Sequence, residues 1–447
     1  MLTNTLVRTV ISGAIAVTAV LPPAAYAQTD SGSTVADPPT FYSNVLPILQ
    51  DNCQVCHQPA GLNLGGMVAP MSLMTYEETR PWAGAMALAV EHRKMPPWHA
   101  SRAFEGKFQG ERYLDEAEIE TIVAWAEAGA PEGTPPSNWE APEPDKEADG
   151  GWALGEPDLI LELDEPFLLE DDVEDLYVTL TATLTEDMLP EYRWIKSVEY
   201  RPGPYVHHIL RGMGGLAPGN QPIIYDNGYG RLMPEGPRAI EFDMHYHKEA
   251  GEETAAYDQT EVGIRFMEPG EVVRYRTTSE MLGIMDFVIP PDESSYSASR
   301  EYHFEEDVYI AGFTPHMHLR GKAALYELTY PDGRHEQLLH VPSYDFSWQH
   351  SYDFKEPVRV PAGSTLRFTL WWDNSEENPS NPDPTVEVRY GEPTTAEMGF
   401  GFMQLRAIEE DEIIVGQPIS DEVRRLYGET IPMSNDAEDR RRSGSGQ

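Results

Sequence analysis

The sequence predicts a multidomain protein in which a small all-α domain is followed by an all-β region long enough for two β-sandwiches. Three observations support this prediction. Residues 38–131 carry apolar side chains at helical spacing, residues 132–151 are rich in Pro, Glu, Asp and Gly without any periodicity, and residues 152–420 contain runs that alternate apolar and polar side chains. With 447 residues, of which 40% are hydrophobic, the chain can bury more than one core.

Residues 1–27 have the pattern of a cleaved export signal. Arg8 precedes an apolar stretch over residues 10–21, and the small-residue site Ala25-Tyr26-Ala27 follows it. The apolar stretch is too short to span a bilayer, and no later segment is both long enough and free of charge. We therefore expect a periplasmic or secreted protein that has no membrane span in its mature form.

Charge limits the partners of this protein. The formal net charge is −43, and a charge of this sign repels nucleic acid and anionic membrane surfaces at long range, so neither is expected to bind. Acidity alone identifies no substrate. The last residues, 435–447, are polar with three consecutive arginines and are predicted to be a disordered tail.

Two helices are predicted within the all-α domain. An apolar stripe marks the first one: Val45, Leu46, Ile48 and Leu49. The second begins at Asp115 and Glu118, which have the spacing of a capping box, and it ends at Gly129 and Pro131. Its apolar residues keep helical spacing: Ile119, Ile122, Val123 and Ala126.

The two cysteines of the chain, Cys53 and Cys56, are followed directly by His57. Cys-x-x-Cys-His is the attachment motif of a c-type haem, because two thiols at this spacing form two thioether bonds and the adjacent imidazole ligates the iron. A disulfide or half of a zinc site are the alternatives, but zinc would need further ligands at similar spacing. With helices on both sides of the motif, residues 38–131 resemble a small cytochrome c domain.

The haem iron needs a sixth ligand or an open position. We favour Met95 as that ligand, because it lies in Lys94-Met95-Pro96-Pro97-Trp98 and this loop is similar to the distal-ligand loop of cytochromes c. The alternative is that Met95 only packs on the haem. The other candidates in this window are Met67, Met71, Met74, Met86, His92 and His99, of which the two histidines are expected to be surface residues.

The β region is predicted from alternation at both of its ends. Near its start one face is apolar (Leu176, Val178, Leu180, Ala182 and Leu184), and near its end the pattern recurs (Leu366, Phe368, Leu370 and Trp372). Histidines cluster within this region in three places: His207 with His208, His245 with His247, and His316 with His318. The dispersed histidines are expected to be ordinary surface or core residues: His303, His335, His340 and His350.

Strand geometry decides which of these histidines can share a metal ion. His316 and His318 project to the same face of a strand, whereas His207 and His208 share a side only if the backbone bulges or ends there. Imidazoles suit copper, zinc, iron or nickel, and the thioether of Met398 would favour Cu(I). The pattern alone fits Met398 better as a core residue.

The order His207-His208, His245-Tyr246, His316-x-His318 and Glu397-Met398 resembles the copper type II, ascorbate-dependent monooxygenases. This family includes peptidylglycine α-hydroxylating monooxygenase and dopamine β-monooxygenase. The resemblance implies two jelly-roll-like β-sandwiches, here residues 152–290 and 291–420, each of which holds one copper ion beside an open cleft.

The resemblance also implies the ligands. His207, His208 and His245 match the electron-transfer copper, although His247 shares a strand face with His245 and competes for the third place. A second copper, at which the family activates O2 and hydroxylates a C–H bond, matches three further residues: His316, His318 and Met398.

Departures from the family pattern bear on the substrate. The peptide-hydroxylating members have an Arg where this chain has Thr314, and Phe400 and Phe402 replace polar residues after Met398. A peptide C-terminus is therefore a poor substrate, and we expect a small, non-peptide molecule. Phe400 and Phe402 either make the pocket more apolar or simply pack in the core. The disulfides of the eukaryotic members cannot form here.

Together these features predict an exported haem-copper monooxygenase with a covalent haem c and two copper ions. An external donor, either a small reductant or a redox protein, would reduce the haem, which passes electrons toward His207, His208 and His245. Two alternatives stay open. One is a non-catalytic copper-binding or electron-transfer protein of the periplasm. The other is a haem peroxidase with a passive β region, which requires that Met95 is not a ligand.

Overall fold

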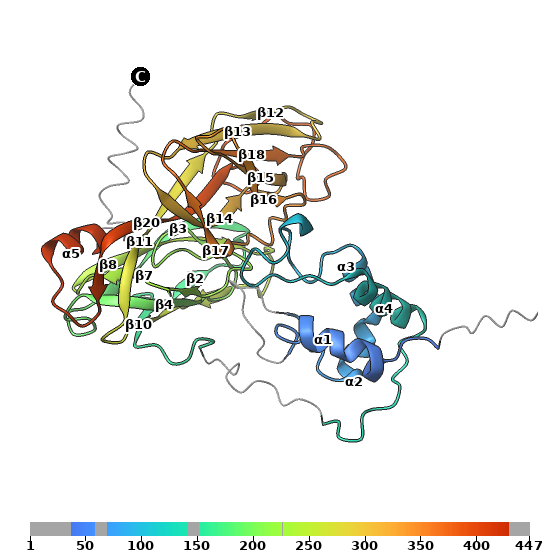
Figure 1. Ribbon diagram of the computed structural model, residues 1–447. Helices are drawn as coiled ribbons and strands as arrows, with labels where there is room; N and C mark the ends of the chain where they lie inside the picture. Colours follow the sequence, from blue (N-terminus) through green and yellow to red (C-terminus); the bar gives the residue numbers. More distant parts are fainter. Residues whose placement is uncertain (1–36, 59–68, 141–151, 226, 429–447) are drawn as a thin grey trace, which may run out of the picture. The chain divides into compact units, whose positions relative to one another are not determined.

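The computed structural model describes residues 37–58, 69–140, 152–225 and 227–428. Four predictions therefore lie outside the described residues: the export signal at 1–27, the candidate ligand Met67, the second half of the linker and the tail at 435–447. The described part is mostly β-sheet with a few helices (Figure 1). Within it, no helix has the length and apolar character needed to cross a membrane.

The N-terminal helical part consists of short elements. In chain order they are the helical turn η1 (Phe41–Val45), α1 (Leu46–Asn52), α2 (Tyr76–Thr79), the turn η2 (Arg80–Trp82), α3 (Ala83–Glu91), the turn η3 (Arg102–Phe104) and α4 (Glu116–Glu127). The capping box predicted at Asp115 is confirmed, since its side chain accepts the N–H of Glu118 and the Glu118 side chain accepts the N–H of Asp115.

The helices enclose a small core of their own. Phe41, Leu49 and Trp125 are fully buried in it. The two ends of this part are held together at Pro131, whose carbonyl accepts the backbone N–H of Phe41 and the indole N–H of Trp125. The chain after α4 is therefore tied back to η1.

One large sheet runs through both halves of the β region. Its strands in spatial order are β1 (Leu159–Glu162), β10 (Glu261–Phe266), β4 (Arg193–Arg201), β7 (Tyr229–Met233), β11 (Val272–Gly283), β20 (Phe400–Ile414), β14 (Val308–His316) and β17 (Tyr352–Val360), with β6 (Ile223–Ile224) paired to β4. Neighbouring strands are antiparallel except β7 and β11, which pair in parallel over two residues and join the halves.

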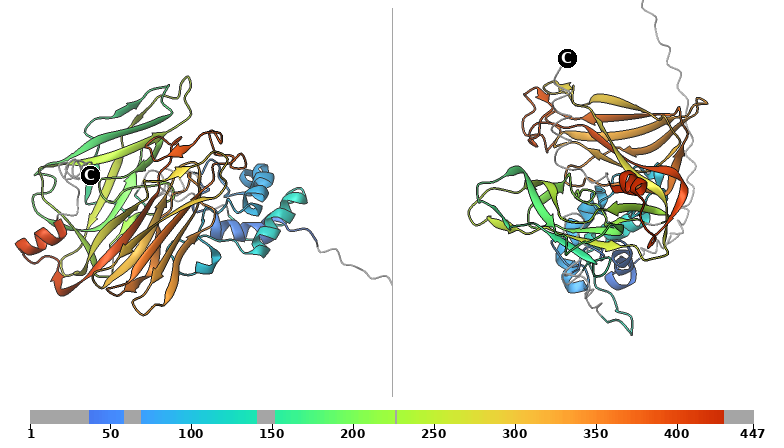
Figure 2. Two further views of the ribbon diagram at one scale, coloured as in Figure 1. Left: turned by 90° about the horizontal axis from the view of Figure 1, so that it is seen from above. Right: turned by 90° about the vertical axis from the view of Figure 1, so that its left-hand side faces the viewer.

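Smaller sheets complete the two halves. The first half adds β3 (Asp175–Leu184), β8 (Arg238–His247) and β5 (Val206–Ile209), together with the pair β2 (Phe167–Leu169) and β9 (Ala256–Asp258). The second half adds β13 (Tyr296–His303), β18 (Thr365–Trp372), β15 (Gly321–Thr329) and β16 (His335–Val341), together with the pair β12 (Val288–Ile289) and β19 (Val388–Arg389). The helix α5 (Asp421–Gly428) follows β20, and Figure 2 shows these layers from two further directions.

Two separate apolar cores lie between these layers. The apolar face predicted for β18 is confirmed, because its four residues are completely buried in the second core. The apolar face predicted for β3 is confirmed as well, since those residues pack into or against the first core. The β11 strand takes part in both, with Val273 in the first core and Leu282 in the second.

Residues 98–109 leave the helical core and join the second β core. Trp98, Phe104 and Phe108 are buried together with residues of β14 and β17. The backbone N–H of Ser101 donates to the backbone carbonyl of His340, and that of Gln109 donates to the backbone carbonyl of Asp353. The sequence places this loop in the helical domain at 38–131. In the structure its large apolar side chains are buried against the second sandwich, because burial there removes their apolar surface from water.

Candidate functional site

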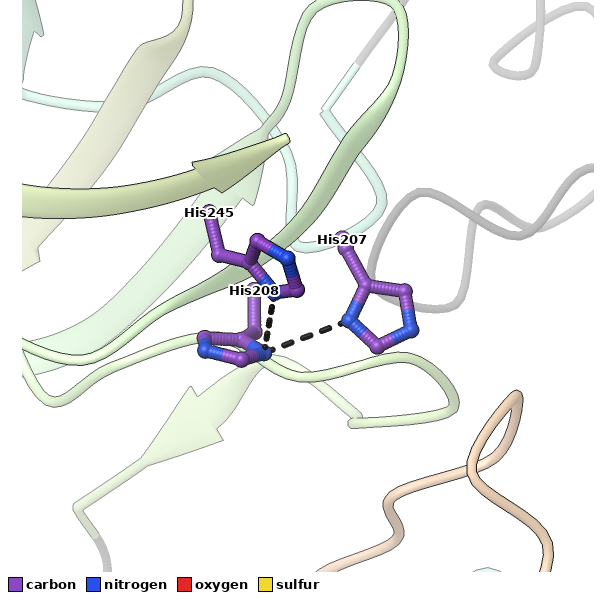
Figure 3. Close-up of side chains that lie close together, drawn as sticks. All are labelled: His207, His208 and His245. Atoms are coloured by element: carbon purple, nitrogen blue, oxygen red, sulfur yellow. Dashed lines mark hydrogen bonds between the residues drawn. The ribbon is translucent and has the colours of Figure 1, made fainter. Parts of the chain in front are cut away.

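His207 and His208 lie on β5, and His245 lies opposite them on β8. The pairing of β5 with β8 shifts between Val206 and His208, so that His208 faces His245 and His207 has no partner across the ladder. A bulge of this kind lets two consecutive side chains reach one place. The bulge that would allow His207 and His208 to share a side is therefore present, and the three rings lie close together (Figure 3).

The Nδ1 atoms of these three histidines converge. The Nδ1 atom of His208 lies 3.2 Å from that of His207 and 3.4 Å from that of His245. Each ring offers one nitrogen in a group whose members all lie within 4.8 Å of one another. Three imidazole nitrogens at this spacing are a donor set for copper or zinc. We call His207, His208 and His245 the first histidine set.

Asp175 and Tyr177 of β3 hold the ring of His245 in place. The Nε2–H of His245 donates to the Asp175 carboxylate, so the lone pair of this imidazole is on Nδ1, which faces the set. The Tyr177 ring stacks on His245 with 4.0 Å between centroids. Burial opposes ionisation of Asp175, but hydrogen bonds from His245 and Thr394 outweigh it and lower the pKa of this carboxyl.

His247, the rival for the third place, lies at the edge of the first histidine set. Its side chain is 44% exposed, and its Nδ1 atom is 3.9 Å from the Asp175 carboxylate. Its ring centroid is 6.0 Å from that of His207, against 5.1 Å for His245. Geometry thus brings His245 into the set and leaves His247 beside it.

His316 and His318 form a second set at the end of β14, with 5.4 Å between their ring centroids. Both are buried. The Nδ1–H of His316 donates to the side-chain oxygen of Gln349 at 2.6 Å, and the Gln349 amide donates to the Phe346 carbonyl, which fixes its direction. The Nε2 atom of His316 and both ring nitrogens of His318 are buried without a hydrogen-bond partner. Buried nitrogens of this kind are expected where a metal ion binds.

Met398 is buried. The pairing of β14 with β20 ends at His316 and Phe400, so His318 and Met398 both lie just beyond the paired strands. The carboxylate of Glu397, the residue before Met398, accepts the backbone N–H of His318 at 2.9 Å. Two imidazoles and a thioether are a donor set for Cu(I).

The two histidine sets touch each other. The ring centroids of His208 and His316 are 5.4 Å apart. Phe346 lies against both sets, stacked on His207 at 4.4 Å between centroids and 6.0 Å from His318. The resemblance implies two copper sites beside an open cleft, whereas here five imidazoles form one buried cluster.

Burial keeps these imidazoles neutral. It is the first cause that lowers the pKa of His316 to about 4 and of His318 to about 3. Burial and the neighbouring imidazoles lower the pKa of His207 and His208 well below its usual value. A neutral imidazole keeps the lone pair that a metal ion requires, so the cluster is ready to bind metal at neutral pH.

The Cys-x-x-Cys-His motif forms a tight turn at the end of α1. The backbone N–H groups of Cys56 and His57 both donate to the Cys53 carbonyl, and no disulfide joins the two cysteines. The Nδ1 atom of His57 lies 3.2 Å from the Met71 carbonyl. Since a carbonyl only accepts, the proton of this imidazole is on Nδ1, and Nε2 keeps the lone pair that an axial ligand needs.

A cavity of about 340 Å³ lies among residues 90–119 and 342–343, and Arg112 in its wall interacts electrostatically with Cys56 of the motif. Met95 lines it together with Trp98, His99, Arg112 and Tyr113. Arg112 is close enough to Cys56 for its charge to oppose the rise that burial causes in the pKa of that thiol. In the described part of the chain no carboxylate forms an ion pair with Arg112, so an anionic group would find a cation here.

The candidates for the sixth haem position separate by location. Met86 is buried in the helical core, Met71 packs against it, and Met74 is buried without lining the cavity. His92 is exposed at the rim of the cavity, whereas His99 is half-buried and its Nδ1 atom lacks a partner. Met95 and His99 are thus the candidates that both line the cavity and are shielded from solvent.

Three residues that support the histidine sets escaped sequence reasoning: Asp175, Phe346 and Gln349. Asp175 lies 70 residues before His245 and 219 residues before Thr394, so no local pattern connects it with either. Gln349 lies in a stretch where polar and aromatic residues are mixed, and it belongs to no motif. Glu397 was visible beside Met398, but its role as an acceptor of backbone N–H groups was not.

Comparison with known proteins does not identify this chain. No family model and no curated protein sequence matches it. Among solved structures, the major capsid protein P2 of bacteriophage PM2 matches 57% of this chain and 99% of its own length at 7% identity, with a TM-score of 0.25. A tandem CBM22 domain of Xyn10C from Paenibacillus barcinonensis matches 56% of this chain and 93% of its own length at 11% identity, with a TM-score of 0.14. At these TM-scores the likenesses assign neither fold nor function.

Proposed function

We propose that this protein is an exported haem-copper monooxygenase, which uses O2 to hydroxylate a C–H bond of a small, non-peptide substrate and receives its electrons through the haem-binding part. The observation that carries the proposal is the cluster of five neutral imidazoles, in which Glu397, the residue before Met398, holds the backbone of His318. Its two halves have different donor sets, three imidazoles in one and two imidazoles with a thioether in the other. A copper store has little use for this difference.

The residues fit two copper ions. His207, His208 and His245 would bind the first ion through the Nδ1 atoms that converge in the structure. His316 and His318, with Met398, would bind the second through ring nitrogens that otherwise lack partners. When bound, the copper ions would supply single-electron chemistry and activate O2, and the haem would accept and release single electrons.

The residues also fit a covalent haem. Cys53 and Cys56 would form the thioether bonds, and His57 presents a free Nε2 atom for the iron. Met95 lines the cavity that includes Arg112 and would supply a thioether ligand to the iron. The Arg112 guanidinium lies near Cys56 and would pair with a carboxylate of the haem.

The surroundings of the second set favour an apolar substrate. The Phe400 ring is stacked with His316 at 6.1 Å between centroids, and it also contacts Phe402. Thr314, at the position where the peptide-hydroxylating members have an Arg, forms a hydrogen bond with Ser351 and offers no positive charge. A substrate carboxylate would therefore find no cation at Thr314.

The test is copper-dependent O2 consumption by full-length protein whose haem and copper contents are known. We expect Met398→Leu to lose most O2 consumption, because the leucine keeps the volume of the side chain and removes the sulfur ligand. Met403→Leu is the matched control, since Met403 is a buried methionine of the second core on β20, the strand that begins two residues after Met398. Equal rates for the two variants would contradict the proposed role of Met398.

A non-catalytic copper-binding or electron-transfer protein is the second candidate. The contact between the two histidine sets favours it, because a substrate between them requires the sets to separate. The same measurement distinguishes the two functions. Copper-loaded protein that consumes no O2 with any reductant supports the second candidate and contradicts the first.

A further inference from the structure

Residues 346–350 connect β16 to β17 and lie between the histidine cluster and the cavity at Met95. We call this stretch the bridge segment. Phe346, Gln349 and His350 are buried, although the segment belongs to no strand. Buried aromatic and polar side chains in a connecting loop are unusual, because such loops normally run over the surface. The segment therefore requires an explanation beyond joining two strands.

One end of the bridge segment contacts both histidine sets. Gln349 accepts the Nδ1–H of His316 at 2.6 Å, and the Phe346 ring stacks on His207. Gln349 is thus a single hydrogen bond from a proposed copper ligand.

The other end contacts the loop that carries Met95. The ring of His350 lies 5.6 Å from that of Trp98 and 5.7 Å from that of His99, both of which line the cavity at Met95. Trp348 stacks on His350, with 5.7 Å between centroids. His350 therefore contacts three aromatic rings, two of which line the cavity: Trp98, His99 and Trp348.

The first sandwich holds this junction together as well. The Gly219 carbonyl lies 3.3 Å from Nδ1 of His350, and the Asn220 side chain accepts the backbone N–H of Ser351 at 2.9 Å. Loops from the helical part and from both sandwiches thus meet at His350. Burial lowers the pKa of His350 to about 3, so this imidazole stays neutral and needs no counter-ion.

We propose that the bridge segment carries electrons from the haem to the copper at His316, with Trp98 and His350 at the haem end and Gln349 at the copper end. This inference rests on the proposed function and deepens it. Family resemblance implies that the first histidine set accepts the electron. Here a hydrogen bond joins Gln349 to His316, which itself touches His208, whereas only a ring contact joins Phe346 to His207.

Each transfer moves a single electron. Ferrous haem becomes ferric as a cupric ion becomes cuprous, and no bond is formed or broken. An external single-electron donor, either a small reductant or a redox protein, restores the ferrous haem. The protein contributes the buried path between the two centres.

The test uses full-length protein loaded with haem and Cu(II) under anaerobic conditions. The haem is reduced by a light flash, its reoxidation is followed optically, and loss of the Cu(II) signal is followed by freeze-quench electron paramagnetic resonance. We expect His350→Leu to slow both changes by about tenfold, which corresponds to about 1.4 kcal/mol in the barrier. His350→Phe restores the aromatic ring and should recover most of the rate. His303→Leu is the control, because His303 lies on β13 and contacts Thr365 instead.

Copper content, the haem spectrum and the two midpoint potentials should be the same in all variants, which separates a change of path from damage to either centre. If His350→Leu does not fold, His350→Gln removes the same ring and can still donate a hydrogen bond to the Gly219 carbonyl. A wild-type rate in His350→Leu, or the same haem oxidation without copper, overturns the inference. Protein that transfers electrons but consumes no O2 contradicts the monooxygenase proposal alone, and protein that binds no copper contradicts both.

Discussion

The two histidine sets are built by different means, although they touch. In the first set, strand pairing does most of the positioning, because β5 and β8 are direct neighbours and a bulge turns His207 toward its partners. In the second set, His318 lies beyond the end of β14 and has no strand partner. Hydrogen bonds from buried side chains hold this set instead of backbone hydrogen bonds between strands. Gln349 holds the ring of His316, and Glu397 holds the backbone of His318.

Because the two sets are held by different interactions, the loss of one side chain should affect them differently. A site made by paired strands depends on many backbone hydrogen bonds, so the loss of one side chain changes a ligand and leaves the frame intact. A site at a strand end depends on a few buried polar groups, each of which costs free energy when its partner is removed. The second set should therefore couple metal binding to folding stability more strongly than the first.

Glu397→Ala should have the largest effect on stability. Its carboxylate accepts N–H groups from His318, Arg320 and Trp372, and Arg320 is buried beside it. Removing this buried partner should lower the free energy of unfolding by about 3–5 kcal/mol, as measured by urea denaturation of the full-length protein. Glu397→Gln keeps an acceptor oxygen and should lose less. An alanine variant as stable as wild type would refute the proposal that the second set depends on the buried Glu397 carboxylate.

Asp175→Asn should mainly affect the first set. The asparagine removes the charge that fixes the proton of His245 on Nε2, and copper affinity should fall by about 10–100-fold in a chelator competition. Asp164→Asn is a matched control, because Asp164 bonds the backbone N–H and hydroxyl of Thr183 much as Asp175 bonds those of Thr394. Equal affinities of the two variants would show that Asp175 does not orient His245.

Gln349→Leu should weaken the second set by a smaller amount. Leucine fills the space but leaves Nδ1 of His316 without an acceptor, so its ring can rotate, and we expect about a tenfold loss of copper affinity. The copper signals should show that the loss falls on the site with the thioether. Gln337→Leu, on the surface strand β16, is the control. An effect confined to the first set would contradict the assignment of Gln349 to His316.

His247→Ala should have the smallest effect. The side chain is largely exposed and lies outside the convergent Nδ1 atoms, so the free energy of unfolding should change by no more than about 0.5 kcal/mol. Copper content should match wild type, whereas His245→Ala should lose the first copper ion. Loss of copper in the His247 variant would reverse the choice between these two histidines.

Local patterns predicted the elements that depend on near neighbours. The capping box at Asp115 and the buried faces of β3 and β18 all follow from periods of a few residues. The same reasoning treated His350 as an ordinary residue, because its partners Trp98 and Gly219 are far away in the chain. It also assigned residues 98–109 to the helical part, because a loop has no periodic pattern that indicates the core against which its apolar side chains pack.

Residue types and short spacings can be read directly from the sequence. They were enough to identify the thiol pair with its adjacent imidazole, the three histidine clusters and the mostly β character of the fold. Only the tertiary structure decided that a bulge aligns His207 with His208, that His245 and not His247 joins them, and that the two sets touch. These outcomes rest on contacts between residues tens to hundreds of positions apart, such as Asp175 with Thr394. Such contacts form only when distant strands and loops are packed together.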